Sequence, residues 1–118
     1  MSYQAVILTV SDSCAAGTRT DTSGPAIRAM LENAGFAVQA MQTVPDEEGQ
    51  ISAAIVHACD ILQADLVVTT GGTGLSPRDV TPEATLAVLD REIRAIPVAM
   101  WVEGLKSAPR AMLSRAVA

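Results

Sequence analysis

The pattern of apolar and polar residues predicts three strands along the chain. Residues 65–70 (DLVVTT) are expected to form one strand, and residues 4–11 (QAVILTVS) are a nearly continuous apolar run with β-branched residues. That pattern is typical of a strand covered on both faces, as in a parallel sheet. Residues 37–44 (AVQAMQTV) form the third expected strand, and they lie between the other two in the sequence.

Segments with helical spacing of apolar residues separate these strands. The first is expected to begin at Ser23 as N-cap and to end before Gly35 as a left-handed C-cap. The second follows the acidic stretch 45–48, and its apolar positions step by 4, 3 and 4. A third is expected over residues 84–92, capped by Thr81. Residues 12–22 are expected to be a polar loop, 96–103 helical or irregular, and 107–115 a loop with a weak helical pattern.

The alternation of strand and helix defines the expected fold class. Consecutive βαβ units imply right-handed crossovers and a mostly parallel sheet with helices on both faces. The expected fold is therefore α/β, a three-layer, doubly wound arrangement. The 118 residues contain no linker, repeat or low-complexity tract, so a single domain over residues 1–118 is expected.

Composition narrows the possible partners. Hydrophobic residues make up 49% and charged residues 18% of the chain, which is typical of a folded, soluble domain. A net charge of −5 and an aromatic content of 3% argue against nucleic-acid binding. No apolar stretch reaches the roughly 20 residues of a membrane span, and the first strand starts without a leader, so a cytoplasmic protein is expected. Cys14 and Cys59 lack the spacing of a zinc site or a disulfide framework.

Acidic residues follow the ends of all three predicted strands. Asp12 follows the first strand, Asp46 the second, and Asp79 lies a few residues beyond the third. Because the carboxyl ends of parallel strands meet at one edge of the sheet, these carboxylates can converge on one crevice. Oxygen ligands of this kind suit Mg²⁺. The alternative for each residue, and for Asp46 especially, is a turn former or helix cap.

A glycine-rich loop, Gly71-Gly72-Thr73-Gly74, follows the third strand without a spacer. Three glycines in four residues let backbone N–H groups approach a ligand closely, and phosphate oxygens are natural occupants. The loop is neither a Walker A motif nor GxGxxG. A tight structural turn is the open alternative.

Five sequence blocks together resemble a known family. They are LTVSDS at 8–13, DTSGP at 21–25, VPDE at 44–47, TTGGTGLSPRDVTPEAT at 69–85 and MLSRA at 112–116. In this order they resemble the molybdopterin adenylyltransferase family of molybdenum cofactor biosynthesis, the MogA/MoaB type that also forms a domain of gephyrin. The glycine loop differs from the GGxSxG of molybdenum insertases and from the GGxGPTxDD of CinA-type proteins.

The resemblance implies a reaction and a set of site residues. The terminal phosphate of molybdopterin would attack the α-phosphorus of ATP, with Mg²⁺ required, and would give adenylylated molybdopterin and pyrophosphate. Asp46 and Asp79 are the implied catalytic carboxylates and Mg²⁺ ligands. Ser114 and Arg78 are expected on the pterin side. The nucleotide and its phosphates are expected to contact Gly71, Gly72, Thr73, Gly74, Asp12 and Ser13.

Features of the C-terminal part add further expectations. Family members usually continue past the LSR segment through another strand and a helix, so this chain is expected to be short at its C-terminal end. The family's habit implies a homo-oligomer, a trimer or a dimer of trimers, with apolar contacts around Met100 and Trp101. Two alternative functions stay open: a non-catalytic module that binds pterin or nucleotide, and a CinA-like nucleotide pyrophosphatase.

Overall fold

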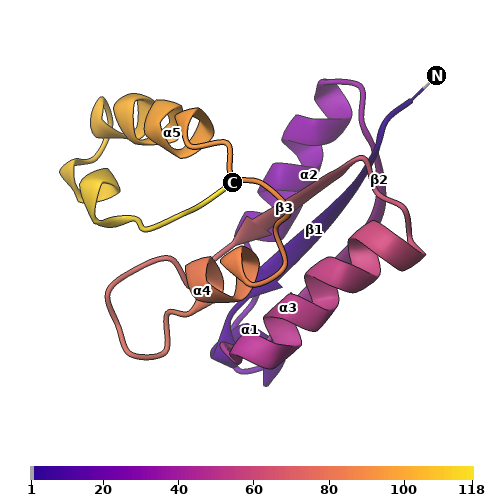
Figure 1. The fold of residues 1–118 in the computed structure, drawn as a ribbon, viewed down its shortest axis with the longest axis horizontal. Helices are drawn as coiled ribbons and strands as arrows, with labels where there is room; N and C mark the ends of the chain where they lie inside the picture. The colour runs from indigo at the N-terminus through magenta and orange to yellow at the C-terminus, as the bar shows by residue number, and fades with distance from the viewer. Residues whose placement is uncertain (1) are drawn as a thin grey trace.

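The computed structural model describes residues 2–118 and contains a parallel sheet of three strands in the order β2-β1-β3 (Figure 1). The strands are β1 (Gln4–Val10), β2 (Ala37–Val44) and β3 (Leu66–Thr70). β1 pairs along its full length with β2, and residues 5–9 pair with β3. All three predicted strands are thus confirmed, with the first strand of the chain at the centre of the sheet.

Helices and short helical turns connect and follow the strands. They are α1 (Asp12–Ala15), α2 (Ser23–Asn33), α3 (Glu48–Val56), α4 (Thr81–Leu86) and α5 (Ala95–Leu105), with a π-helical turn η1 (His57–Ile61) and a 3-10 turn η2 (Pro109–Leu113). The chain crosses from β1 to β2 through α2 and then back over β1 to β3 through α3. Because right-handed crossovers in opposite directions lie on opposite faces, α2 and α3 cover different sides. The predicted three-layer α/β class is confirmed.

The core surrounds β1. Val6, Leu8 and Val10 pack with Ile51 and Ile55 of α3 in one buried cluster. Side chains alternate along a strand, so Ile7, which is 1% exposed, points to the opposite face, where α2 packs against β1. The central strand is therefore buried on both faces, as its continuous apolar sequence predicts.

Two predicted caps and one predicted helix were wrong. Ser23 is the first residue of α2, and the Asp21 carboxylate accepts a hydrogen bond from the Gly24 N–H at 3.0 Å in its place. Thr81 is the first residue of α4, because its hydroxyl donates to the Gly71 carbonyl at 2.9 Å instead of capping the helix. The helix expected over residues 84–92 spans Thr81–Leu86, after which the backbone tightens into turns.

The short α1 replaces the first part of the loop expected over residues 12–22. Its N-cap is Ser11, whose hydroxyl accepts a hydrogen bond from the Cys14 N–H at 3.2 Å. The helical turn brings Asp12 and Cys14 back toward the end of β1 and leaves residues 16–22 as the connection to α2.

The C-terminal part packs on itself more than on the sheet. α5 and η2 contact each other and lie to one side of the sheet in Figure 1. Pro97 is the buried residue of α5, whereas Val98, Met100 and Val102 are about half exposed. Within residues 2–118, no helix has the length and apolarity needed to cross a membrane.

Candidate active site at the carboxyl ends of the strands

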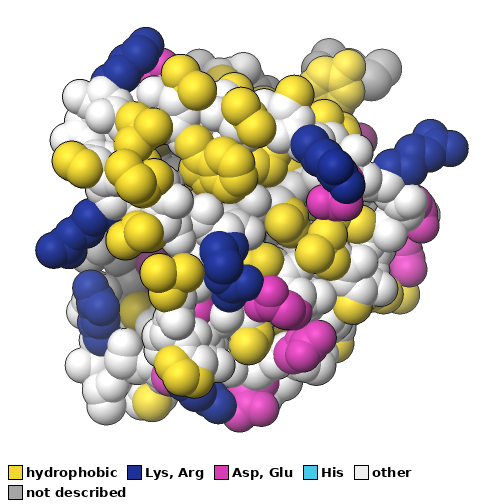
Figure 2. Space-filling model, turned by 60° about the vertical axis from the view of Figure 1, so that its left-hand side comes forward, with side chains coloured by type: hydrophobic (Ala, Val, Ile, Leu, Met, Phe, Trp, Pro, Cys, Tyr) yellow, Lys and Arg dark blue, Asp and Glu magenta, His cyan; other side chains and the backbone are white. Residues whose placement is uncertain are grey.

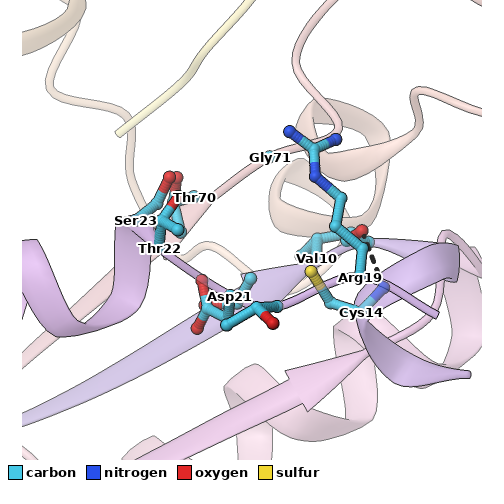
Figure 3. A pocket seen from close by; sticks show the side chains of 11 residues that line it. Val10, Cys14, Arg19, Asp21, Thr22, Ser23, Thr70 and Gly71 are labelled. Atoms are coloured by element: carbon cyan, nitrogen blue, oxygen red, sulfur yellow. Dashed lines mark hydrogen bonds between the residues drawn. The ribbon is translucent and has the colours of Figure 1, made fainter. Parts of the chain in front are cut away.

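A pocket lies where the connections from neighbouring strands diverge. β1 leads toward α2 on one face, whereas β3 leads toward α4, which packs against α3 on the other. Ligands of open α/β sheets bind at such switch points, beyond the carboxyl ends of the strands. A pocket of about 190 Å³ opens there (Figure 3). It is lined by residues 9–11, Cys14, residues 19–23, Thr70 and Gly71.

The glycine loop passes directly over the end of β1. Gly71 and Gly72 have φ angles of +94° and +68°, which favour glycine. A Cβ on Gly71 would collide with the carbonyl oxygen of Val10, and one on Gly72 would collide with the Thr81 hydroxyl. The Thr81 N–H also donates to the Gly72 carbonyl at 3.0 Å. The loop thus packs closely between β1 and α4, as a structural turn would. This packing does not exclude a ligand at the loop, so the two alternatives drawn from the sequence are compatible with each other.

Asp12 and Asp46 hold the first two strand ends together. The Asp12 N–H donates to Asp46 Oδ2 at 2.9 Å, and the Asp46 N–H donates to Asp12 Oδ1 at 2.9 Å. Asp46 therefore accepts from the first turn of α1, while the N-cap of α3 is Glu47. The expected convergence of these two carboxylates is confirmed. The capping alternative for Asp46 also holds, but for α1 and not for α3, the helix that follows Asp46 in the sequence.

Arg78 reaches across from the third strand's loop to this pair. Its Nε and Nη2 atoms donate to the two Asp12 carboxylate oxygens at 3.1 and 2.9 Å, and Nη2 lies 3.5 Å from Glu47 Oε1. The hydrogen bonds from Arg78, followed by the Asp46 backbone N–H, lower the pKa of Asp12, and the Asp12 carboxylate raises the pKa of Arg78. Arg78, predicted for the pterin side, and Asp12, predicted for the nucleotide side, are thus paired with each other.

Asp79 bonds within its own loop. Its Oδ2 accepts from the Ser76 N–H at 3.0 Å, and its N–H donates to the Ser76 carbonyl at 2.9 Å. Gly74 lies against this carboxylate, where a Cβ would come within 2.8 Å of Oδ2. Among residues 2–118, no group of three or more His, Cys, Asp or Glu side chains is placed to hold a metal. A shared metal on Asp46 and Asp79 stays a prediction.

The predicted pterin-side and nucleotide-side residues lie next to each other. Ser114 Oγ lies 3.4 Å from Thr73 Oγ1, although 41 positions separate the two residues. Ser13 lies at the other edge of the site, where its hydroxyl is 3.2 Å from that of Ser11. The predicted site residues therefore lie in the connections that follow the three strands, where Asp12 and Ser13 belong to α1, or in the segment after η2.

Sequence reasoning noted Asp21 in the loop after the first strand but gave it no specific role, and it missed Arg19 and Arg115. Asp21 accepts from the Thr9 hydroxyl at 2.9 Å as well as from Gly24, and Figure 3 shows Asp21 and Arg19 at the pocket. Arg115 donates to the carbonyl of Gly74 at 2.9 Å. The available signal was their place in or beside the DTSGP and MLSRA blocks, which gives no indication of their contacts.

These features define a class of protein. Gly71 of the glycine loop, Arg19 and Asp21 line a crevice at the switch point of an open α/β sheet, an arrangement suited to a phosphorylated ligand. The chain belongs to the family described as the probable molybdopterin binding domain, whose model matches residues 6–118. The family membership predicted from the five sequence blocks is thus confirmed.

Individual relatives agree with this assignment. The molybdopterin adenylyltransferase of Haemophilus influenzae is 41% identical over 113 residues, which are 94% of this chain and 57% of that protein. The MoaB structure from Thermus thermophilus has a TM-score of 0.91 and 45% identity, over 98% of this chain and 72% of that one. A molybdopterin biosynthesis protein from Mycobacterium abscessus has a TM-score of 0.92 and 42% identity, with the same coverage. The chain spans less than two thirds of the H. influenzae protein.

Proposed function

We propose that this protein adenylylates molybdopterin. The terminal phosphate of molybdopterin attacks the α-phosphorus of ATP, a new P–O bond forms, and pyrophosphate leaves. The observation that supports this most directly is the contact between Ser114 and Thr73, because it joins the expected pterin side to the expected nucleotide loop. The H. influenzae relative, a molybdopterin adenylyltransferase, points the same way.

Two of the predicted site residues have the chemistry that Mg²⁺ binding requires. Asp46 and Asp79 offer hard oxygen donors, the ligands that Mg²⁺ prefers, and within residues 2–118 Asp46 Oδ1 and Asp79 Oδ1 make no hydrogen bond. We propose that these two carboxylates hold the ion. When bound, it would offset the charge repulsion between two anionic reactants.

The chain's own groups have positioning roles. The backbone N–H groups of residues 71–74 orient the phosphates for in-line attack, as such amides do in other phosphoryl-transfer sites. Arg78 exchanges its hydrogen bonds with Asp12 for bonds to an anionic ligand, because the pair is half exposed and held by surface hydrogen bonds. Asp12 and Ser13 complete the phosphate side. Little covalent chemistry is asked of the protein.

Further proposals concern the assembly and its setting. We propose that residues 1–118 act as one domain in a cytoplasmic homo-oligomer, a trimer or a dimer of trimers. Figure 2 shows hydrophobic side chains gathered on the face that includes α5. The exposed apolar side chains of α5 include Val98, Met100, Val102 and Leu105, and Leu113 of η2 is exposed as well. Patches of this kind are typical of subunit contacts.

The first test uses the Asp79→Asn variant. Pyrophosphate release with ATP, Mg²⁺ and molybdopterin should fall by about 100-fold or more, because a carboxylate at the charge-bearing centre is lost. The exposed Asp90, which makes no hydrogen bond within residues 2–118, supplies the matched control Asp90→Asn, with turnover unchanged. Normal turnover of Asp79→Asn contradicts the assignment.

Titration of ATP with and without Mg²⁺ separates the alternatives. Metal-dependent binding together with pterin-dependent pyrophosphate release supports the transferase. Binding without turnover indicates a binding module, and ATP hydrolysis without pterin indicates a CinA-like pyrophosphatase.

A further inference from the structure

Arg115 makes an unusual set of contacts with the glycine loop. Its backbone N–H donates to the Thr73 carbonyl at 2.8 Å, and its Nε donates to the Gly74 carbonyl at 2.9 Å. Its Nη2 donates to the Asp79 carbonyl at 2.7 Å, and its Nη1 contacts Glu83 Oε2 at 2.7 Å. One residue thus ties both ends of the segment 73–79 to helix α4.

Arg115 supplies hydrogen bonds at both ends of this loop, whereas Arg78 ties its middle to Asp12. Thr81 anchors Gly71 and Gly72, and Asp79 bonds to Ser76 inside the loop. Within residues 2–118, the carbonyls of Thr73 and Gly74 accept hydrogen bonds from Arg115 alone. Burial contributes little here, because the Leu75 side chain is 68% exposed.

The chemistry of arginine explains why this residue type is present. A guanidinium has five donors in a planar fork, so one side chain can satisfy two carbonyls and a carboxylate at once. The lysine ammonium is a point charge and cannot reproduce that geometry. The side chains of Arg115 and Glu83 are 37% and 46% exposed, so the ion pair itself is screened and the carbonyl contacts matter more.

We propose that Arg115 is a positioning residue that holds the loop 71–79, and with it Asp79 and the phosphate-facing amides, in the conformation that adenylyl transfer requires. The inference rests on the proposed function for its catalytic part. Its structural part concerns the unliganded protein and is tested separately.

Amide hydrogen exchange of the unliganded protein tests the structural part. The N–H groups of Ser76, Asp79 and Thr81 bond within the loop or to it, so they report its opening. In Arg115→Lys and Arg115→Met these amides should exchange at least about tenfold faster, while residues 6–10 of β1 keep their rates. Arg110, exposed and on the same segment, provides the control Arg110→Met, which should leave the loop unchanged.

Two outcomes of that experiment overturn the proposal. Unchanged loop exchange in both Arg115 variants shows that the guanidinium does not hold the loop. Faster exchange throughout β1 shows a role in global stability instead. Glu83→Gln is the control for the ion pair, because it removes the carboxylate charge and keeps the contacts of Arg115 with the loop carbonyls. The loop amides of this variant should exchange less than about threefold faster than those of the unaltered protein.

Kinetics test the catalytic part. A misplaced Asp79 weakens transition-state contacts more than ground-state binding, so Arg115→Lys should lower kcat by about 10- to 100-fold with KM for ATP changed less than about threefold. An equal kcat for Arg115→Lys and the unaltered protein overturns this part. The unaltered protein could also release no pyrophosphate although loop exchange rises in the Arg115 variants. In that case the proposed function has failed, whereas the structural part, that Arg115 holds the loop, stands.

Discussion

At the scale of single residues, Gly71 shows how closely the loop is fitted to the sheet. Its positive φ and the Val10 carbonyl oxygen both oppose a side chain. Gly71→Ala should therefore destabilise the fold by about 2 kcal/mol or more, through backbone strain and a forced shift of the loop. Urea unfolding measures this change, and ATP titration should show weaker binding.

Gly49 is the matched control for that substitution. It lies inside α3, and a Cβ there meets open space. Gly49→Ala should stabilise the protein by about 0.5 to 1 kcal/mol, because alanine is the better helix former. Equal effects at the two glycines would contradict the close fit of the loop.

The Asp12 carboxyl provides a pH-dependent prediction. Arg78 lowers the pKa of Asp12, so the pair stabilises the fold at pH values above the ordinary aspartate pKa of about 3.9. That contribution is lost as the pH falls through the lowered pKa. Arg78→Gln should move the Asp12 pKa up toward its usual range, as measured by carboxyl NMR titration, whereas Arg110→Gln should not. An unchanged Asp12 midpoint in Arg78→Gln would contradict the pairing in solution.

At the scale of elements, α3 is the main support of the core face of the sheet. Ile51 is fully buried among Val6, Leu8 and Val10. Ile51→Ala should cost about 2 to 5 kcal/mol in the free energy of unfolding, because it leaves a cavity in a packed core. Ile61, 70% exposed at the end of η1, offers the same change as a control with an expected cost below about 0.5 kcal/mol. Comparable losses would show that α3 packs differently.

Elements were predictable from sequence where burial alone sets the pattern. The strand β1 follows from its apolar run because both of its faces are covered, whereas several residues of β2 are exposed. The left-handed Gly35, with φ +97°, ends α2 as expected. The caps at Ser23 and Thr81 were wrong because a hydroxyl has several possible partners. Local sequence does not show that the Asp21 carboxylate accepts from the Gly24 N–H or that the Gly71 carbonyl accepts from the Thr81 hydroxyl.

The candidate site was also predictable only in part, because local sequence does not show which partner a polar group meets. The glycine loop and the acids at the strand ends are local features in the sequence. The Asp12–Asp46 pair and the Arg115 contacts each join positions more than 30 residues apart, and the sheet order decides which side chains meet. The resemblance supplied Ser114, whose contact with Thr73 no spacing rule reveals.

At the scale of the whole molecule, the exposed apolar face of α5 leads to a prediction about assembly. Light scattering should give a mass of three or six times the 12.2 kDa of one chain. Met100→Lys, 59% exposed on α5, should shift the mass toward the monomer, because it places a charge in an apolar contact. Met30→Lys, 73% exposed on α2, is the control and should not. A monomeric mass for the unaltered protein would contradict the proposal.

The central place of β1 also governs the order of events during synthesis. β1 emerges from the ribosome first, yet its two partners come from residues 37–44 and 66–70. Until residue 70 has emerged, the apolar segment 5–10 has at least one unpaired edge, a condition that favours pairing with other nascent chains. The strand at the centre of the finished fold is thus open to such pairing for as long as its second partner has not been made.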